Sequence, residues 1–205
     1  MDWKDKFLDK VVCGDCLELM KELPDGCVDL VVTDPPYGVG KAKWDKLPVG
    51  ALREAWRVCG RAMLVFWNAF DLERMPREIG VEPKNVCVWW KPNVAALYMF
   101  DRSRLSAQWE PVFYFSKNGG ALAQHSTDVF AFNSNPRLHP TEKPLPLLRK
   151  LIWLFAGDLI LDPFLGSGTT AIAAKQLGRH FIGMEIEPKY CEIAERRLSQ
   201  EVLKL

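Results

Sequence analysis

The sequence lacks any apolar run long enough to span a bilayer, which excludes a membrane-spanning helix. It also lacks an export signal, because the first six residues, Met1 to Lys6, are too polar for a signal peptide. We therefore expect a cytoplasmic protein with no membrane partner. In that compartment the six cysteines are expected to be reduced thiols.

The spacing of a structural metal site is missing as well. Cys13 and Cys16 form a single C-x-x-C, and no second pair of ligands follows at similar spacing. Two interpretations stay open, a metal or redox role and a pair of buried free thiols. The missing second pair favours the thiols, so we predict no metal.

Neither sign of charge predominates. Lys and Arg number 27 and Asp and Glu number 26, which gives a formal net charge of +1. This balance neither indicates nor excludes a nucleic-acid partner, so a DNA-binding face would have to come from local basic clusters. Internal repeats, low-complexity segments and a clear interdomain linker are also missing. Residues 1–205 are therefore predicted to form a single α/β domain with a substantial core.

Short apolar runs alternate with segments of helical spacing. The run at 28–33 is almost continuously apolar, as in a strand buried on both faces of a parallel sheet. Strands are predicted at 11–13, 28–33, 62–67, 86–90, 112–115, 159–161 and 180–184. Helices are predicted at 16–23, 49–58, 70–79, 144–155, 171–177 and 188–203, whereas 117–136 shows no clear period. The alternation predicts a doubly wound α/β sheet.

A glycine-rich turn joins the predicted strand at 159–161 to the helix that follows it. Gly166 and Gly168 allow a tight turn and a close approach to a ligand, and nearby hydroxyl groups can cap the helix, from Ser167, Thr169 and Thr170. Glu185 ends the next strand, about where dinucleotide-binding folds place an acid on ribose hydroxyls. A purely structural turn is the alternative. The order of strand, turn, helix, strand and acid favours an adenosine-containing cofactor.

Two absences narrow the choice of cofactor. No Lys follows the second glycine, so the turn is not a Walker phosphate loop. The third glycine of the dinucleotide-binding pattern is missing too, which disfavours NAD and FAD. Asp162, just before the turn, suits a ligand with a positive amino group better than one with phosphates. S-adenosylmethionine, which carries no pyrophosphate, fits this pattern.

The tetrapeptide Asp34-Pro35-Pro36-Tyr37 follows directly on the buried strand at 28–33, and ligands of open α/β sheets bind outside the carboxyl ends of strands. The amino nitrogen of a base is a poor nucleophile, because its lone pair is delocalised into the ring. A carboxylate and a backbone carbonyl can each accept one amino hydrogen and offset the positive charge gained during attack. Tyr37 can stack on a flipped base. A rigid turn with a capping Asp and a packed Tyr is the alternative.

Five segments together resemble the permuted, beta-class amino-methyltransferases of DNA, which use S-adenosylmethionine and in which the catalytic motif precedes the cofactor motif. They are Gly14–Cys16, Thr33–Gly38, His139–Pro144, Asp162–Thr170 and Gly183–Glu185. Their order and spacing run through nearly the whole chain. The resemblance implies a Rossmann-like sheet of seven strands, mostly parallel with one antiparallel strand, in circularly permuted motif order.

The resemblance also implies a site. The catalytic residues would be Asp34, Pro35, Pro36 and Tyr37. The adenine would lie beside Asp15 and Cys16, the ribose beside Glu185, and the methionine amino group near Asp162. The full cofactor-binding set would be Asp15, Cys16, Thr141, Lys143, Asp162, Pro163, Phe164, Gly166, Ser167, Gly168, Thr169 and Glu185. The stretch from His139 to Lys143 would pack against the cofactor, although a capped helix entry is the alternative there.

Contacts to DNA are expected from basic and aromatic residues in two loops and near the end of the patternless segment. The candidates are Lys41, Lys43, Trp44, Arg102, Arg104 and Arg137. Two tryptophan-containing segments, 88–92 and 108–112, resemble family segments that flank the base pocket, but tryptophan also packs in sheet cores. The family usually carries a larger target-recognition region than the interval of about 117–138 found here. A short or relaxed target sequence is therefore predicted.

The resemblance implies a DNA methyltransferase acting on adenine N6, with a homodimer as a possible assembly and a bacterial, archaeal or phage origin. N4-cytosine methylation is the first alternative, although it more often goes with Ser at the position of Asp34. Methylation of a protein glutamine or an RNA base usually goes with the opposite motif order. A catalytically silent binding subunit is the remaining alternative, and the intact site residues disfavour it.

Overall fold

A computed structural model describes residues 2–38, 47–94, 108–117, 122–136 and 141–202. Its strands are β1 (Lys10–Cys13), β2 (Val28–Thr33), β3 (Cys59–Phe66), β4 (Asn85–Trp90), β5 (Trp109–Ser116), β6 (Val129–Ala131), β7 (Leu159–Asp162) and β8 (His180–Glu185). They form one sheet in the order β1-β8-β7-β2-β3-β5-β4-β6. Only β5 is antiparallel to its neighbours among these strands. The predicted doubly wound sheet with one antiparallel strand is confirmed.

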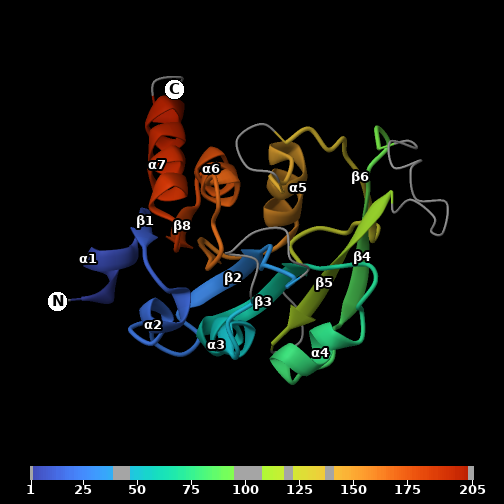
Figure 1. Ribbon diagram of the computed structural model, residues 1–205, viewed down its shortest axis with the longest axis horizontal. Helices are drawn as coiled ribbons and strands as arrows, with labels where there is room; N and C mark the ends of the chain where they lie inside the picture. Colours follow the sequence, from blue (N-terminus) through green and yellow to red (C-terminus); the bar gives the residue numbers. More distant parts are fainter. Residues whose placement is uncertain (1, 39–46, 95–107, 118–121, 137–140, 203–205) are drawn as a thin grey trace.

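Helices cover both faces of the sheet (Figure 1). They are α1 (Trp3–Phe7), α2 (Cys16–Met20), α3 (Ala51–Val58), α4 (Arg74–Ile79), α5 (Leu145–Leu154), α6 (Thr169–Gln176) and α7 (Pro188–Val202). Alternate residues of β2 serve two cores: Leu30 and Val32 face α5 and α6, and Val31 faces α2 and α3. Such two-sided burial explains why this strand reads as a continuous apolar run.

The sheet has eight strands in the described part of the chain, not the expected seven. The additional strand is β6, which lies in the segment that showed no clear period. It has three residues, of which Phe130 is buried while Val129 and Ala131 are exposed. A pattern this short carries almost no periodic signal. Helix α1, which is capped by the side chain of Asp2, was also not predicted from the sequence.

Parallel pairing of β2 with β7 joins two distant parts of the chain. Leu30 is in register with Ile160 and Val31 with Leu161. On the other side of β7, β8 pairs with β1 so that Glu185 is in register with Cys13. The carboxyl ends of β2, β7, β8 and β1 therefore meet at one edge of the sheet, and this edge holds both predicted motifs.

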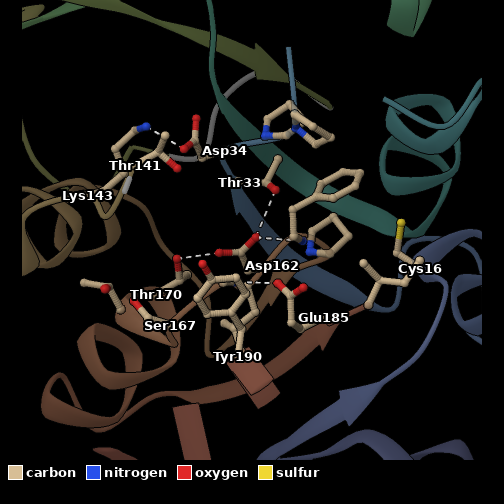
Figure 2. Close-up of a pocket in the computed structure, with 18 of the residues that line it drawn as sticks. Cys16, Thr33, Asp34, Thr141, Lys143, Asp162, Ser167, Thr170, Glu185 and Tyr190 are labelled. Carbon is tan, nitrogen blue, oxygen red and sulfur yellow. Dashed lines mark hydrogen bonds and ion pairs between the residues drawn. The ribbon is translucent and has the colours of Figure 1, made fainter. Parts of the chain in front are cut away.

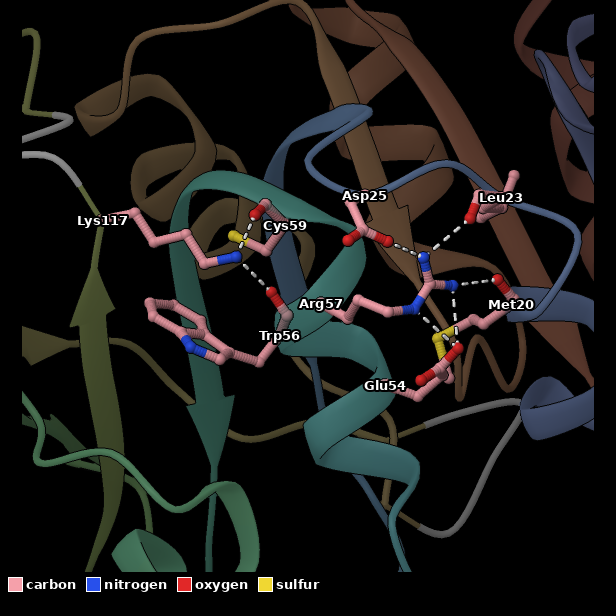
Figure 3. Close-up of polar contacts among 8 residues, drawn as sticks. All are labelled: Met20, Leu23, Asp25, Glu54, Trp56, Arg57, Cys59 and Lys117. Carbon is pink, nitrogen blue, oxygen red and sulfur yellow. Dashed lines mark hydrogen bonds and ion pairs between the residues drawn. The ribbon is translucent and has the colours of Figure 1, made fainter.

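At the opposite edge, where β2 and β3 begin, the side chain of Arg57 fastens α3 to the end of α2 (Figure 3). Its guanidinium donates to the backbone oxygens of Met20 at 2.7 Å and Leu23 at 3.0 Å. The carboxylates of Glu54 and Asp25 accept from it as well. The backbone oxygens at the end of α2 thereby obtain donors that the helix itself does not supply.

Lys117 makes a similar attachment after β5. Its ammonium donates to the backbone oxygens of Trp56 at 2.6 Å and Cys59 at 2.7 Å, and it lies 4.6 Å from the centre of the Trp56 ring (Figure 3). Both acceptors belong to the last turn of α3 and the start of β3. We call Arg57 and Lys117, with these partners, the amino-edge cluster.

Candidate active site

A cavity of about 400 Å³ opens at the carboxyl ends of β2, β7 and β8 (Figure 2). Its wall includes the whole predicted catalytic set, Asp34, Pro35, Pro36 and Tyr37. The predicted cofactor-binding residues that line it are Asp15, Cys16, Thr141, Lys143, Asp162, Pro163, Phe164, Gly166, Ser167, Thr169 and Glu185. The volume falls within the range of small-molecule sites. The fold thus brings the two predicted sets together around one space.

The remaining predicted cofactor residue, Gly168, lies behind the loop and not on the cavity wall. Its φ of +89° is left-handed, and a Cβ placed there would lie 2.8 Å from the Cβ of Ala194. Glycine is therefore required so that the loop can turn closely against α7.

The predicted DNA contacts, Lys41, Lys43, Trp44, Arg102, Arg104 and Arg137, all lie outside the described residues. Within the described ranges no group of three His, Cys, Asp or Glu side chains is arranged to hold a metal ion. The same part of the chain contains no helix long and apolar enough to cross a membrane. All six cysteines are free thiols, with Cys13 exposed and Cys16 buried.

Asp162 links the two strands that carry the motifs. Its carboxylate accepts from the hydroxyls of Thr33 at 2.9 Å and Thr170 at 2.6 Å, and from the backbone N–H of Phe164 at 3.1 Å. Burial raises the pKa of Asp162 to about 7, although these three hydrogen bonds oppose the shift. The group can therefore change charge close to neutral pH.

Glu185 ends β8 on the floor of the cavity. Its carboxylate accepts from the backbone N–H groups of Gly166 at 2.7 Å and Glu187 at 2.9 Å. Burial raises its pKa, and those N–H groups oppose the rise. Asp15, two residues after the partner of Glu185 in β1, caps α2 by accepting from the N–H of Leu17 at 2.9 Å. Both acids are thus fixed in place by backbone donors.

Cys16 lies on the same wall as Asp15, at the start of α2. Burial raises the pKa of its thiol to about 12, and the charge of Asp15 adds to the shift. The side chain is therefore an apolar thiol at neutral pH and not a nucleophile.

The tetrapeptide predicted to be catalytic contributes to a largely buried ionic group that continues to the end of β4 and into β5. The carboxylate of Asp34 accepts from the Tyr37 hydroxyl through Oδ1 at 2.5 Å and from the Lys143 ammonium through Oδ2 at 2.5 Å. Glu110 Oε1 lies 3.4 Å from the same ammonium, and Glu110 Oε2 lies 3.0 Å from the ammonium of Lys91. We call these five residues the carboxyl-edge network.

The charges of this network balance, with two ammonium groups against two carboxylates. Burial by itself would lower the pKa of Lys143, but Asp34 and Glu110 outweigh it and raise the pKa above the ordinary value. Burial would likewise raise the pKa of Glu110, but Lys143 and Lys91 outweigh it and hold the pKa below the ordinary value. Both groups are therefore charged at neutral pH although they are buried.

Tyr37 combines a polar and an apolar contact. Its ring meets the ring of Trp67 edge to face, with centroids 5.3 Å apart. Burial, followed by the charges of Asp34 and Glu110, raises the pKa of its hydroxyl well above the ordinary value. The hydroxyl is therefore a hydrogen-bond donor at any physiological pH.

Three functional candidates were not singled out from the sequence: Lys91, Glu110 and Arg197. The first two belong to the tryptophan-containing segments, where Trp90 pairs with Trp109. In the sequence, the signal for these two residues was a charged side chain directly after a tryptophan, Lys91 after Trp90 and Glu110 after Trp109. Arg197 bonds the Ser167 backbone oxygen at 2.7 Å and lies 3.0 Å from Glu142. Nothing in the helical pattern of α7 distinguishes it from a surface arginine.

Comparison with known proteins agrees with this geometry. Residues 28–196 match the N6_N4_Mtase family, described as DNA methylase. The chain belongs to this family. The predicted resemblance to DNA amino-methyltransferases is thereby confirmed, and as a DNA methylase the protein acts on DNA.

Individual relatives cover the methylase almost end to end. It is 31% identical to the putative methylase YubD of Escherichia coli K12, over 94% of this chain and 91% of that protein. The crystal structure of an M1.HpyAVI–SAM complex aligns with a TM-score of 0.73 and 25% identity, covering 92% of this chain and 98% of that one. PvuII DNA methyltransferase, titled cytosine-N4-specific, shares the fold at 21% identity and a TM-score of 0.69, covering 90% and 84%.

Proposed function

We propose that this DNA methylase transfers the methyl group of S-adenosylmethionine to the N6 amino group of an adenine flipped out of the duplex. The observation that carries the proposal is the shared cavity. The Asp34 carboxylate and the loop from Asp162 to Thr169 line one space, although the sequence separates them by more than a hundred residues. The acceptor for an amine and the site for a methyl donor therefore face each other.

The residues around the cavity fit S-adenosylmethionine by their chemistry. Asp162 offers a carboxylate to an amino group, and Glu185 offers one to ribose hydroxyls. Cys16 supplies apolar surface for the adenine, and Phe164 supplies it for the methionine portion. M1.HpyAVI, which shares this fold, has been solved with that cofactor. When bound, S-adenosylmethionine supplies a methyl group on a positively charged sulfur.

The tetrapeptide supplies the acceptors for the target amine. Asp34 Oδ and the Pro35 carbonyl each accept one amino hydrogen, which draws the nitrogen toward tetrahedral geometry. The negative charge of Asp34 offsets the positive charge that the nitrogen gains, and such preorganised electrostatic stabilisation is a large catalytic effect. The Tyr37 ring forms one wall of the base pocket, held by Trp67.

Adenine is preferred over cytosine because an Asp heads the tetrapeptide. N4-cytosine methylation is the second candidate, because PvuII methyltransferase has the same fold and its title names cytosine N4. The test is mass analysis of nucleosides after incubating the protein with S-adenosylmethionine and unmethylated duplex DNA. N6-methyladenine is expected. N4-methylcytosine alone would overturn the choice of base, and no methylated nucleoside would indicate a silent binding subunit.

We expect residues 1–205 to form one domain whose target-recognition segment, at about 117–138, is short. A short segment offers few side chains to read bases, so the target sequence should be short or relaxed. Weak base readout leaves phosphate contacts as the main source of affinity, so DNA binding should fall steeply with salt. Methylation of a random-sequence library, mapped by long-read sequencing, tests this. Modification confined to one motif of about five or more base pairs would contradict it. A homodimer and a cytoplasmic location stay predictions.

A further inference from the structure

Each carboxylate oxygen of Asp34 already accepts one hydrogen bond in the structure, although the proposed reaction needs this carboxylate for the substrate. Its Oδ1 accepts from the Tyr37 hydroxyl. Its Oδ2 accepts from the Lys143 ammonium, a contact drawn in Figure 2. An ammonium bonded directly to a carboxylate also cancels the negative charge that would stabilise a positively charged amine. For Asp34 to stabilise the amine with its full negative charge, the Lys143 ammonium must therefore move to another acceptor.

Both donors have the same second acceptor. Glu110 Oε1 lies 3.3 Å from the Tyr37 hydroxyl and 3.4 Å from the Lys143 ammonium. Glu110 projects from β5, whereas Asp34 follows β2, so the two carboxylates reach the donors from different strands. The same oxygen of Glu110 is thus within reach of each group that binds Asp34.

The surroundings of Lys143 require such an acceptor. Its side chain is only 7% exposed, so water would compensate poorly for a lost carboxylate, and a buried ammonium without a partner is strongly unfavourable. The ammonium lies 5.0 Å from the centre of the Phe66 ring and 5.9 Å from that of Trp89. These aromatic faces favour a cation over a short range of positions between the two carboxylates.

Glu110 is held from its other side. Its Oε2 pairs with Lys91 at 3.0 Å, and the ammonium of Lys91 lies 4.5 Å from the centre of the Trp89 ring. This contact leaves Oε1 directed at the Tyr37 hydroxyl and Lys143. The geometry points to a carboxylate that is oriented in advance to receive donors.

We propose that Glu110 is a positioning residue that receives Lys143 and the Tyr37 hydroxyl when the target amino group binds Asp34. This inference rests on the proposed function. The exchange leaves the Lys143 ammonium paired with the Glu110 carboxylate, so the buried cation keeps an anionic partner. It frees Asp34 to accept the amino hydrogen with its negative charge no longer cancelled at contact distance.

Glu110→Gln tests the exchange, because a glutamine has one amide oxygen where two ammonium groups need acceptors. We expect kcat to fall by roughly 10- to 100-fold, since misplaced catalytic groups cost that much. The affinity for S-adenosylmethionine, measured by calorimetry, should change less than about twofold, because Glu110 does not line the cavity. Glu110→Asp, which keeps both oxygens and the charge, should recover a substantial part of kcat.

The matched control is Glu54→Gln, the same chemical change in a partly buried acid that pairs with Arg57 at the other edge of the sheet. It should lower stability and leave kcat unchanged. A double-mutant cycle with Lys143→Met measures the coupling between the two residues in kcat, which a general loss of stability would not produce. If Glu110 acts through Lys143, the effect of Glu110→Gln must shrink in the Lys143→Met background.

The outcomes separate this inference from the proposed function. If the wild-type protein forms no methylated nucleoside, both the proposed function and this inference are wrong. An active wild type with unchanged kcat in Glu110→Gln, or with fully additive effects in the cycle, overturns the inference and leaves the proposed function intact. A kcat loss in Glu110→Gln that matches the loss in Glu54→Gln overturns it too.

Discussion

The two edges of the sheet both bury cations, but they give them different partners. At the amino edge Arg57 and Lys117 each bond two backbone oxygens, and Arg57 also pairs with the carboxylates of Glu54 and Asp25. At the carboxyl edge Lys143 and Lys91 pair with the carboxylates of Asp34 and Glu110. Backbone acceptors are fixed by the fold, whereas side-chain acceptors can exchange partners. We therefore expect the amino edge to stabilise the fold, whereas the proposed exchange at the carboxyl edge would let a substrate enter its network.

Asp34→Ala is expected to give the largest effect on activity. The methyl transfer rate should fall by about a hundredfold or more, because a preorganised acceptor is lost. Calorimetry with S-adenosylmethionine should show nearly unchanged affinity, since the proposed partner of Asp34 is the target amine and not the cofactor. Loss of cofactor affinity together with activity would contradict the assigned role and weaken the distinction between the two edges.

Arg57→Ala should show the reverse pattern. The free energy of unfolding should fall on the order of 2–3 kcal/mol, because several charged hydrogen bonds to partly buried groups are lost. Below the unfolding transition kcat should equal that of the wild type. Urea unfolding and steady-state kinetics check both statements.

The control for this change is Arg77→Ala, which removes an exposed ion pair with Glu73. It should alter stability by less than about 1 kcal/mol. A strong kcat loss in Arg57→Ala, with normal stability, would show that the amino edge is not purely structural.

Glu185→Ala should weaken S-adenosylmethionine binding by about 1.5–3 kcal/mol, because a carboxylate acceptor for the ribose hydroxyls is lost. Titration calorimetry measures the change. Glu192→Ala, at an exposed position on α7, is the control and should bind normally. If the dissociation constant for S-adenosylmethionine is unchanged in Glu185→Ala, the role of Glu185 is only structural, to bind the backbone N–H of Gly166.

Asp162 should give an effect of a different kind, a dependence of stability on pH. Its raised folded pKa means that the folded state keeps a proton that the unfolded state has already lost. The unfolding free energy should therefore decline as pH rises from the ordinary Asp value toward about 7. The slope cannot exceed about 1.4 kcal/mol per pH unit for one group. Asp162→Asn should remove this slope in urea unfolding series.

The same ionisation should act on the cofactor in the opposite direction. An ionised Asp162 attracts a positive amino group, so affinity for S-adenosylmethionine should rise as pH approaches about 7 from below. The gain should be at most about tenfold per pH unit. Calorimetry on wild type and Asp162→Asn separates this from titration elsewhere, and parallel pH curves would rule it out.

The sequence revealed most of the fold because the central strands are buried on both faces. Continuous apolar runs such as 28–33 and 159–161 leave few other structures open, and both are central strands here. Strand β6 was not predicted, because it has only three residues, is the outermost strand of the sheet and buries little more than Phe130. Its position is set by pairing with β4, which is a tertiary interaction and leaves no local pattern.

The candidate site was predictable to the extent that its residues follow strand ends within motifs. Asp34, Asp162 and Glu185 were found in this way and line the cavity. Glu110 lies inside β5, a strand that also reads as sheet core, and its importance depends on a lysine 33 positions later. Pairings between distant charged residues are properties of the folded chain, so no spacing rule could reveal them.

The parallel contact of β2 with β7 also has a kinetic consequence. Thr33 and Asp162, bonded at the end of these strands, are 129 positions apart in sequence. Parallel pairing over such a separation forms slowly, because a long loop must close before any contact is gained. Neither half of the chain can build the cavity by itself, so a nascent or partly folded chain should have no activity. Recovery of methyl transfer after dilution from denaturant should therefore follow the slowest structural phase and show no earlier burst.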